Sequence, residues 1–120
     1  MKIYLSFDTE HLGDVFCDIE WKLPFLPRAG EELIIPKTIK DNNRFNDEYK
    51  QLYIKYKQST YTGLDQDEDI SDGISQYLMG YNRVSYVYYS EDDNGTIIPN
   101  LMLCSEAQYN ADLIDKLREE

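Results

Sequence analysis

The chain has 120 residues, of which 42% are hydrophobic and 29% charged, and its formal net charge is −11. A chain of this length builds one hydrophobic core, and its 11 tyrosines give it more aromatic character than disordered chains carry. The composition excludes a disordered chain, and the length predicts a single domain over residues 1–120, whose α+β class is inferred below from the order of its elements.

The negative charge is concentrated in the second half of the chain. Residues 61–120 contain 13 acidic and 3 basic side chains, whereas residues 31–60 contain 5 acidic and 6 basic ones. A strongly negative field repels nucleic-acid phosphates and anionic membrane surfaces, unless the basic stretch of residues 37–57 forms a local patch. We therefore expect a protein partner or a second copy of the chain, and neither nucleic acid nor membrane.

Short apolar runs and isolated cysteines indicate where the protein works. The first apolar stretch meets Asp8 before it reaches the length of a signal-peptide core, and later runs fall far below the ~20 residues of a membrane helix. Cys17 and Cys104 lack a CxxC partner or a neighbouring histidine. We expect a cytoplasmic protein with two buried, reduced thiols and no cofactor.

The first third of the chain predicts three strands. Apolar residues alternate over residues 2–8 and again over 14–23, and the five residues between them end in Gly13, so the two strands should form an antiparallel hairpin. Pro24 and Pro27 end the second strand, because neither can donate a ladder hydrogen bond. A third, short strand is expected over residues 31–36.

Residues 44–58 favour a helix. Phe45, Tyr49 and Leu52 recur at helical spacing, followed by Tyr53 and Tyr56, and Asn42 or Asn43 could cap the first turn. A strand is the alternative, because apolar residues also alternate over residues 52–56. The polar, anionic residues 59–73 predict a loop.

Two further strands and a helix complete the chain. Residues 77–89 are rich in strand-forming side chains and lead to Asn94-Gly95, a sequence typical of a two-residue type I′ turn. That turn would set Asp93 opposite Thr96, and would also pair Tyr88 with Leu101, Tyr86 with Leu103, Val87 with Met102 and Ser85 with Cys104. Pro99 suggests that the last strand is partly an edge strand.

Ser105 followed by Gln108 resembles a capping box, and apolar residues at helical spacing over 107–117 predict a C-terminal helix. The expected fold is α+β: a mainly antiparallel sheet of about five strands, which could close toward a barrel, with two helices.

One short string suggests metal chemistry. Residues 7–13, Phe-Asp-Thr-Glu-His-Leu-Gly, resemble the first motif of the DEDD family of 3′–5′ exonucleases. That resemblance implies a divalent-metal-dependent phosphodiesterase in which Asp8 and Glu10 are metal ligands. The rest of the family pattern departs: His11 is the only histidine, and Tyr109 stands one residue too close to Asp112 for the tyrosine variant. A pair of carboxylates at a hairpin turn is the alternative that these departures favour.

The acidic loop of residues 65–72 suggests a cation site. Asp65, Asp67 and Asp69 match positions one, three and five of an EF-hand loop, but Ile70 and Gln76 stand where the motif needs Gly and Glu. A weak cation site is one alternative, and a solvated acidic loop is the one the mismatch favours.

The tyrosines carry the remaining functional hypothesis. Tyrosine is enriched at protein interfaces, so an exposed subset would form a partner-binding surface, for which the candidates are Tyr49, Tyr53, Tyr56 and Tyr89. Their spacing also suits a core with hydroxyls at its rim, and we favour that alternative for most of them. The sequence thus leads to a non-enzymatic protein-binding or accessory module with an acidic, tyrosine-rich surface, with the metal-dependent phosphodiesterase as the alternative.

Overall fold

The computed structural model describes residues 1–60, 63 and 69–119. In that part of the chain the elements are β1 (Lys2–Asp8), β2 (Asp14–Glu20), α1 (Pro36–Asn42), α2 (Asp47–Gln58), α3 (Ile70–Leu78), β3 (Arg83–Glu91), β4 (Ile97–Cys104) and α4 (Glu106–Glu119).

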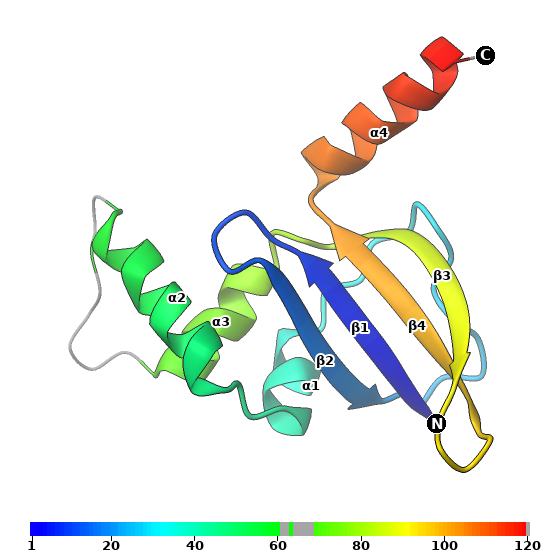
Figure 1. Ribbon diagram of the computed structural model, residues 1–120, viewed down its shortest axis with the longest axis horizontal. Helices are drawn as coiled ribbons and strands as arrows, with labels where there is room; N and C mark the ends of the chain where they lie inside the picture. The colour runs from blue at the N-terminus through cyan, green and yellow to red at the C-terminus, as the bar shows by residue number, and fades with distance from the viewer. Residues whose placement is uncertain (61–62, 64–68, 120) are drawn as a thin grey trace.

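The four strands form one open, mixed sheet in the order β2-β1-β4-β3 (Figure 1). The β1–β2 hairpin is confirmed, with Leu5 opposite Cys17, and β3 and β4 are also antiparallel. In the middle of the sheet, however, β1 and β4 run parallel. The fold is α+β, but the expectation of a five-stranded, mainly antiparallel or barrel-like sheet with two helices is wrong. Parallel strands far apart in the sequence leave no local turn signal, so pattern alone could not reveal the pairing.

The strand expected over residues 31–36 does not form. A single bridge joins Glu32 to Arg83, and the Leu33 amide donates to the Asn82 carbonyl at 2.7 Å. Pro36 then begins α1, a position where its missing N–H costs nothing.

The helix predicted over residues 44–58 is confirmed against the strand alternative, but its cap differs. Asn46 is the N-cap of α2, and its side chain accepts a hydrogen bond from the Tyr49 amide. Asn43 instead lies along the outer edge of β2, where its side chain accepts from the Asp18 amide at 3.0 Å and donates to the Asp18 carbonyl at 2.8 Å. Asn42 accepts from the Glu20 amide in the same way. The side-chain amides of Asn42 and Asn43 thus bond the backbone groups at the edge of β2 with which a further strand would otherwise pair.

Helix α3 occupies residues that the sequence assigned to a loop and a strand. Asp69 caps it by accepting hydrogen bonds from the Ser71 and Asp72 amides, and the buried Ile74 and Leu78 face the core. The strand expected from residue 77 therefore starts only at Arg83. Residues 61–62 and 64–68 of the predicted acidic loop, including Asp65 and Asp67, lie outside the described residues.

The β3–β4 turn shifts the predicted register by one residue. The Gly95 amide donates to the Asp92 carbonyl and the Asp92 amide to the Thr96 carbonyl, each at 3.0 Å. Gly95 has a φ of 80°, whereas Asn94 does not have a positive φ. The turn is therefore a three-residue loop of type I with a glycine bulge instead of the expected type I′. Tyr86 faces Met102 and Tyr88 faces Asn100, so both tyrosines lie on the opposite side of the sheet from Leu101 and Leu103.

The two faces of the sheet differ sharply. One is buried by Ile3, Leu5 and Phe7 of β1 with Leu101 and Leu103 of β4, and it packs against α1–α3. The other face exposes large side chains of the two outer strands, namely Phe16 of β2 and Tyr86 and Tyr88 of β3. Strand β4 lies between β1 and β3, but its ladder to β1 starts only at Asn100, so residues 97–99 pair with β3 alone. The prediction from Pro99 that this strand is partly an edge is confirmed.

The C-terminal helix is confirmed. The Gln108 amide donates to the Ser105 hydroxyl, and α4 then runs away from the sheet (Figure 1), with no buried residue among Glu106–Glu119. Within the described residues, no helix combines the length and the apolar character needed to cross a membrane.

Candidate functional site

A cleft of about 650 Å³ opens where the β1–β2 turn meets the ends of α2 and α3. Its walls come from four separate parts of the chain. Lining side chains include Asp8, Glu10 and His11 from the turn, Tyr56 from α2, Tyr77 and Tyr81 from α3 and its exit, and Gln108 from α4. The fold thus gathers acidic and aromatic groups around one hollow.

The turn that carries Glu10 and His11 is fixed at its base. The Thr9 hydroxyl donates to the Gly13 carbonyl at 2.6 Å and accepts from the Leu12 amide at 3.1 Å. Gly13 has a φ of 69°, a conformation that glycine adopts without strain, and Leu12 is anchored in the core. The two side chains therefore project from a backbone of defined shape.

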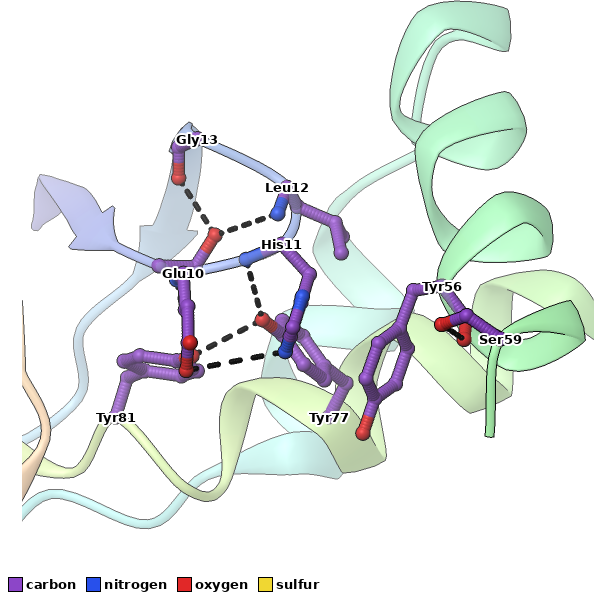
Figure 2. A network of polar contacts seen from close by, with 9 residues as sticks. Glu10, His11, Leu12, Gly13, Tyr56, Ser59, Tyr77 and Tyr81 are labelled. Atoms are coloured by element: carbon purple, nitrogen blue, oxygen red, sulfur yellow. Dashed lines mark hydrogen bonds and ion pairs between the residues drawn. The ribbon is translucent and has the colours of Figure 1, made fainter. Parts of the chain in front are cut away.

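Two tyrosine hydroxyls hold the outer part of the same turn (Figure 2). Tyr81 Oη accepts a hydrogen bond from the Glu10 amide and Tyr77 Oη from the His11 amide, both at 3.1 Å. The two hydroxyls lie 3.0 Å apart and share a further hydrogen bond. One of the two hydroxyl protons serves that shared bond. Burial, with the Tyr81 hydroxyl, raises the pKa of Tyr77, which keeps the phenol neutral.

Aromatic rings form one wall of the cleft. The His11 ring stacks on Tyr56 with centroids 4.4 Å apart and an interplanar angle of 27° (Figure 2). The ring centroids of Tyr56 and Tyr77 lie 5.1 Å apart, and those of Tyr77 and Tyr81 lie 5.4 Å apart. These four rings are a preformed surface on which a planar or cationic group can stack.

Carboxylates stand at the rim of this wall. Glu10 is mostly exposed, and its Oε2 lies 3.8 Å from His11 Nε2. Asp8, at the end of β1, is also exposed and lines the cleft. The combination of acidic oxygens and ring faces fits a positively charged side chain better than an anionic ligand.

The predicted site residues are only partly brought together. Asp8, Glu10 and Tyr56 share the cleft. Tyr53 is buried in the core, and Tyr49 lies at the edge of β2, where its hydroxyl donates to the Asp14 carbonyl at 3.1 Å. Tyr89 lies on β3, is not among the residues that line the cleft, and is 62% exposed.

The metal hypothesis needs a third ligand. Among residues 1–60, 63 and 69–119, no group of three or more His, Cys, Asp or Glu side chains is placed to hold a metal ion. Asp8 and Glu10 line the cleft without another carboxylate beside them in its wall. Of the three aspartates that match EF-hand positions, Asp69 is engaged as the cap of α3 and in an ion pair with Lys40.

Tyr77 and Tyr81 were not identified from the sequence as site residues. Tyr77 lies in the last turn of α3 and Tyr81 just beyond its end, and the surrounding strand-forming residues led to the prediction of a strand there. Asp69 ahead of Ile70, Ile74 and Leu78 was the signal that could have revealed the helix.

The chain matches none of the protein-family models, curated proteins or solved structures with which it was compared. Its function therefore has to be inferred from the residues of the cleft.

Proposed function

We propose that this protein is a non-enzymatic protein-binding module whose cleft receives a basic segment of a partner protein. The observation that carries the proposal is the convergence of Glu10, His11 and three tyrosines on one hollow at the end of β1. An arginine or lysine could place its charge over the Tyr56 ring and donate hydrogen bonds to the rim carboxylates.

The charge of the whole chain supports a basic partner. A net charge of −11 attracts a cationic segment from a distance, and the cleft then provides short-range recognition that a diffuse field does not. The same field disfavours nucleic acid as a partner. The two thiols are buried and unpaired, which fits a reducing compartment, and we propose a cytoplasmic protein on that ground.

The proposal is tested by titrating a fluorescently labelled hexaarginine peptide into the protein and measuring anisotropy. Tyr56→Ala removes a ring of the cleft wall, and Glu10→Gln removes a rim charge. We expect each to weaken binding by about tenfold, since a cation–π or charge-assisted contact contributes about 1–2 kcal/mol.

Matched controls separate the cleft from general electrostatic attraction. Tyr89→Ala removes an exposed tyrosine elsewhere, and Glu119→Gln changes the net charge by the same amount as Glu10→Gln. Both should bind as the wild type does. If all four variants bind alike, or affinity follows net charge alone, the cleft is not the binding site.

A further inference from the structure

The uncovered face of the sheet is unusually apolar for a solvent-exposed surface. Phe16 is 66% exposed, Tyr86 52% and Tyr88 44%, and Met102 lies between the strands that carry them. A hollow of about 430 Å³ on this face is lined by residues of all four strands of the sheet, including Tyr4, Ser6, Phe16, Tyr88 and Asn100. Exposed apolar side chains that cluster on one face mark an interaction surface.

Helix α4 carries a second uncovered apolar surface. Leu113, Ile114 and Leu117 follow one another at helical spacing and are 46%, 49% and 64% exposed. A helix of 14 residues is marginal in water without packing, and no side chain of α4 is buried. Its stability therefore calls for a surface on which this apolar stripe can pack.

The helix does not cover the open face of its own sheet. Only Ser105 separates β4 from α4, and the helix leaves the sheet at the end of that strand (Figure 1). Asp112, Asp115 and Glu119 line the hollow between α4 and its own sheet together with Leu113 and Lys116, whereas Ile114 and Leu117 do not. Ile114 and Leu117 are therefore the part of the apolar stripe that does not face its own sheet.

We infer that two copies of the chain associate by exchange, each laying the apolar stripe of its α4 across the open sheet face of the other. A helix packed on a sheet is the ordinary way to bury one apolar stripe and one apolar face. Because each copy supplies one helix and one sheet face, a two-fold arrangement covers both apolar surfaces of both copies and forms a closed dimer.

The dimensions fit such a pair. With 14 residues α4 is about 21 Å long, and the seven-residue strands β1 and β2 span about 23 Å. Half the lateral surface of a helix about 10 Å wide and 21 Å long is about 330 Å². Two helix–sheet contacts, counted on both sides, bury about 1,300 Å², which is within the range of stable specific interfaces.

Charges oppose this docking overall and favour it only at one point. On the β2 side of the open face, Asp18 pairs with Lys2 and Glu20 with the N-terminal ammonium, which leaves Asp14 to face Lys116 or Arg118 of the last turn of α4. Two chains of −11 each repel at long range, however. Salt should therefore strengthen the dimer, whereas it should weaken the binding of a basic peptide in the cleft.

Sedimentation equilibrium of the full chain from about 10 µM to about 500 µM tests the inference. We expect a monomer–dimer equilibrium that shifts toward dimer in added salt. Leu117→Glu on the helix and Tyr86→Glu on the sheet should each shift it at least tenfold toward monomer. Ile97→Glu, which adds the same charge at an exposed apolar position of the β3–β4 hairpin, should leave it unchanged.

Circular dichroism of each variant verifies that the fold is retained. A wild type that stays monomeric at the highest concentration overturns the inference. So does a dimer that persists in both Leu117→Glu and Tyr86→Glu, because another face would then hold it together. Species that keep growing with concentration would show an open, head-to-tail contact instead of the two-fold exchange.

Discussion

At the scale of single residues, side chains from distant parts of the chain fix the cleft. The Tyr77 and Tyr81 hydroxyls accept the amides of His11 and Glu10, so a turn of the first hairpin is held by the exit of α3. Each of these amides would otherwise point to water. The candidate site is therefore a junction between elements, which explains why only part of it could be read from local sequence.

Gly73 provides the tightest packing constraint near this junction. It lies inside α3, and a Cβ at this position would collide with the ring of the buried Tyr53. Gly73→Ala should therefore lower the free energy of unfolding by about 2 kcal/mol, although alanine is ordinarily the better helix former. Urea denaturation measures this. Gly80→Ala, which meets only an ordinary contact at 3.6 Å from the Tyr77 carbonyl, serves as the control and should change stability far less. Equal effects of the two variants would contradict the packing described for Tyr53.

Because the Cys17 thiol is buried, we expect the protein to lose stability at alkaline pH. Burial, with a smaller contribution from Asp18, raises the pKa of Cys17 to about 12. In the unfolded chain a thiol ionises near pH 8.5–9, whereas in the folded protein Cys17 stays protonated to higher pH. Its contribution to the free energy of unfolding is therefore complete below about pH 8.5–9 and is lost as the pH rises toward 12. Between about pH 9 and pH 11 the wild type should lose about 1 kcal/mol per pH unit from this source. Cys17→Ala should show a shallower decline, measured by urea denaturation at each pH. An identical decline in the variant would mean that other groups account for it.

At the scale of elements, local patterns predicted what local forces determine. The β1–β2 hairpin, the helix over residues 47–58 and the Ser105-capped helix were predicted because alternation, helical spacing and a capping residue act within a few positions. The parallel β1–β4 pairing and helix α3 were missed. The first depends on chain-distant contacts, and the second hides a cap and an apolar period inside an acidic, glycine-containing segment.

The β3–β4 hairpin shows how one side chain changes a register. Asp92 Oδ1 accepts hydrogen bonds from the Asn94 and Thr96 amides, each at 2.9 Å, and this favours the type I turn over type I′. Only Gly95 then needs a positive φ. As a result Tyr86 and Tyr88 turn to the open face, which no pattern of apolar residues indicated.

This turn makes a discriminating prediction. Asn94→Ala should change the free energy of unfolding by less than about 0.5 kcal/mol, because Asn94 has no positive φ. Gly95→Ala should destabilise by about 1 kcal/mol, because alanine is strained in the left-handed conformation. Thermal or chemical denaturation measures both. A large loss in Asn94→Ala would support the type I′ turn and the register that the sequence first suggested.

At the scale of the whole molecule, two acidic regions and an aromatic cleft have different consequences. The hairpin tip of residues 91–93 contributes carboxylates at the end of the sheet, and the acidic side chains of α4 line a separate hollow between that helix and the sheet. The cleft adds a row of aromatic rings, two tyrosine hydroxyls and carboxylates at its rim. We therefore assign the proposed recognition of a basic segment to the cleft.

The measurement that tests this claim most directly is an NMR titration of the isotopically labelled protein with the hexaarginine peptide at moderate salt. We predict saturable chemical-shift changes centred on the amides of Glu10 and His11 and on the rings of Tyr56 and Tyr77, with small changes at the hairpin tip. Shifts that are larger at residues 91–93 and along α4 than in the cleft, or that do not saturate, would contradict the account.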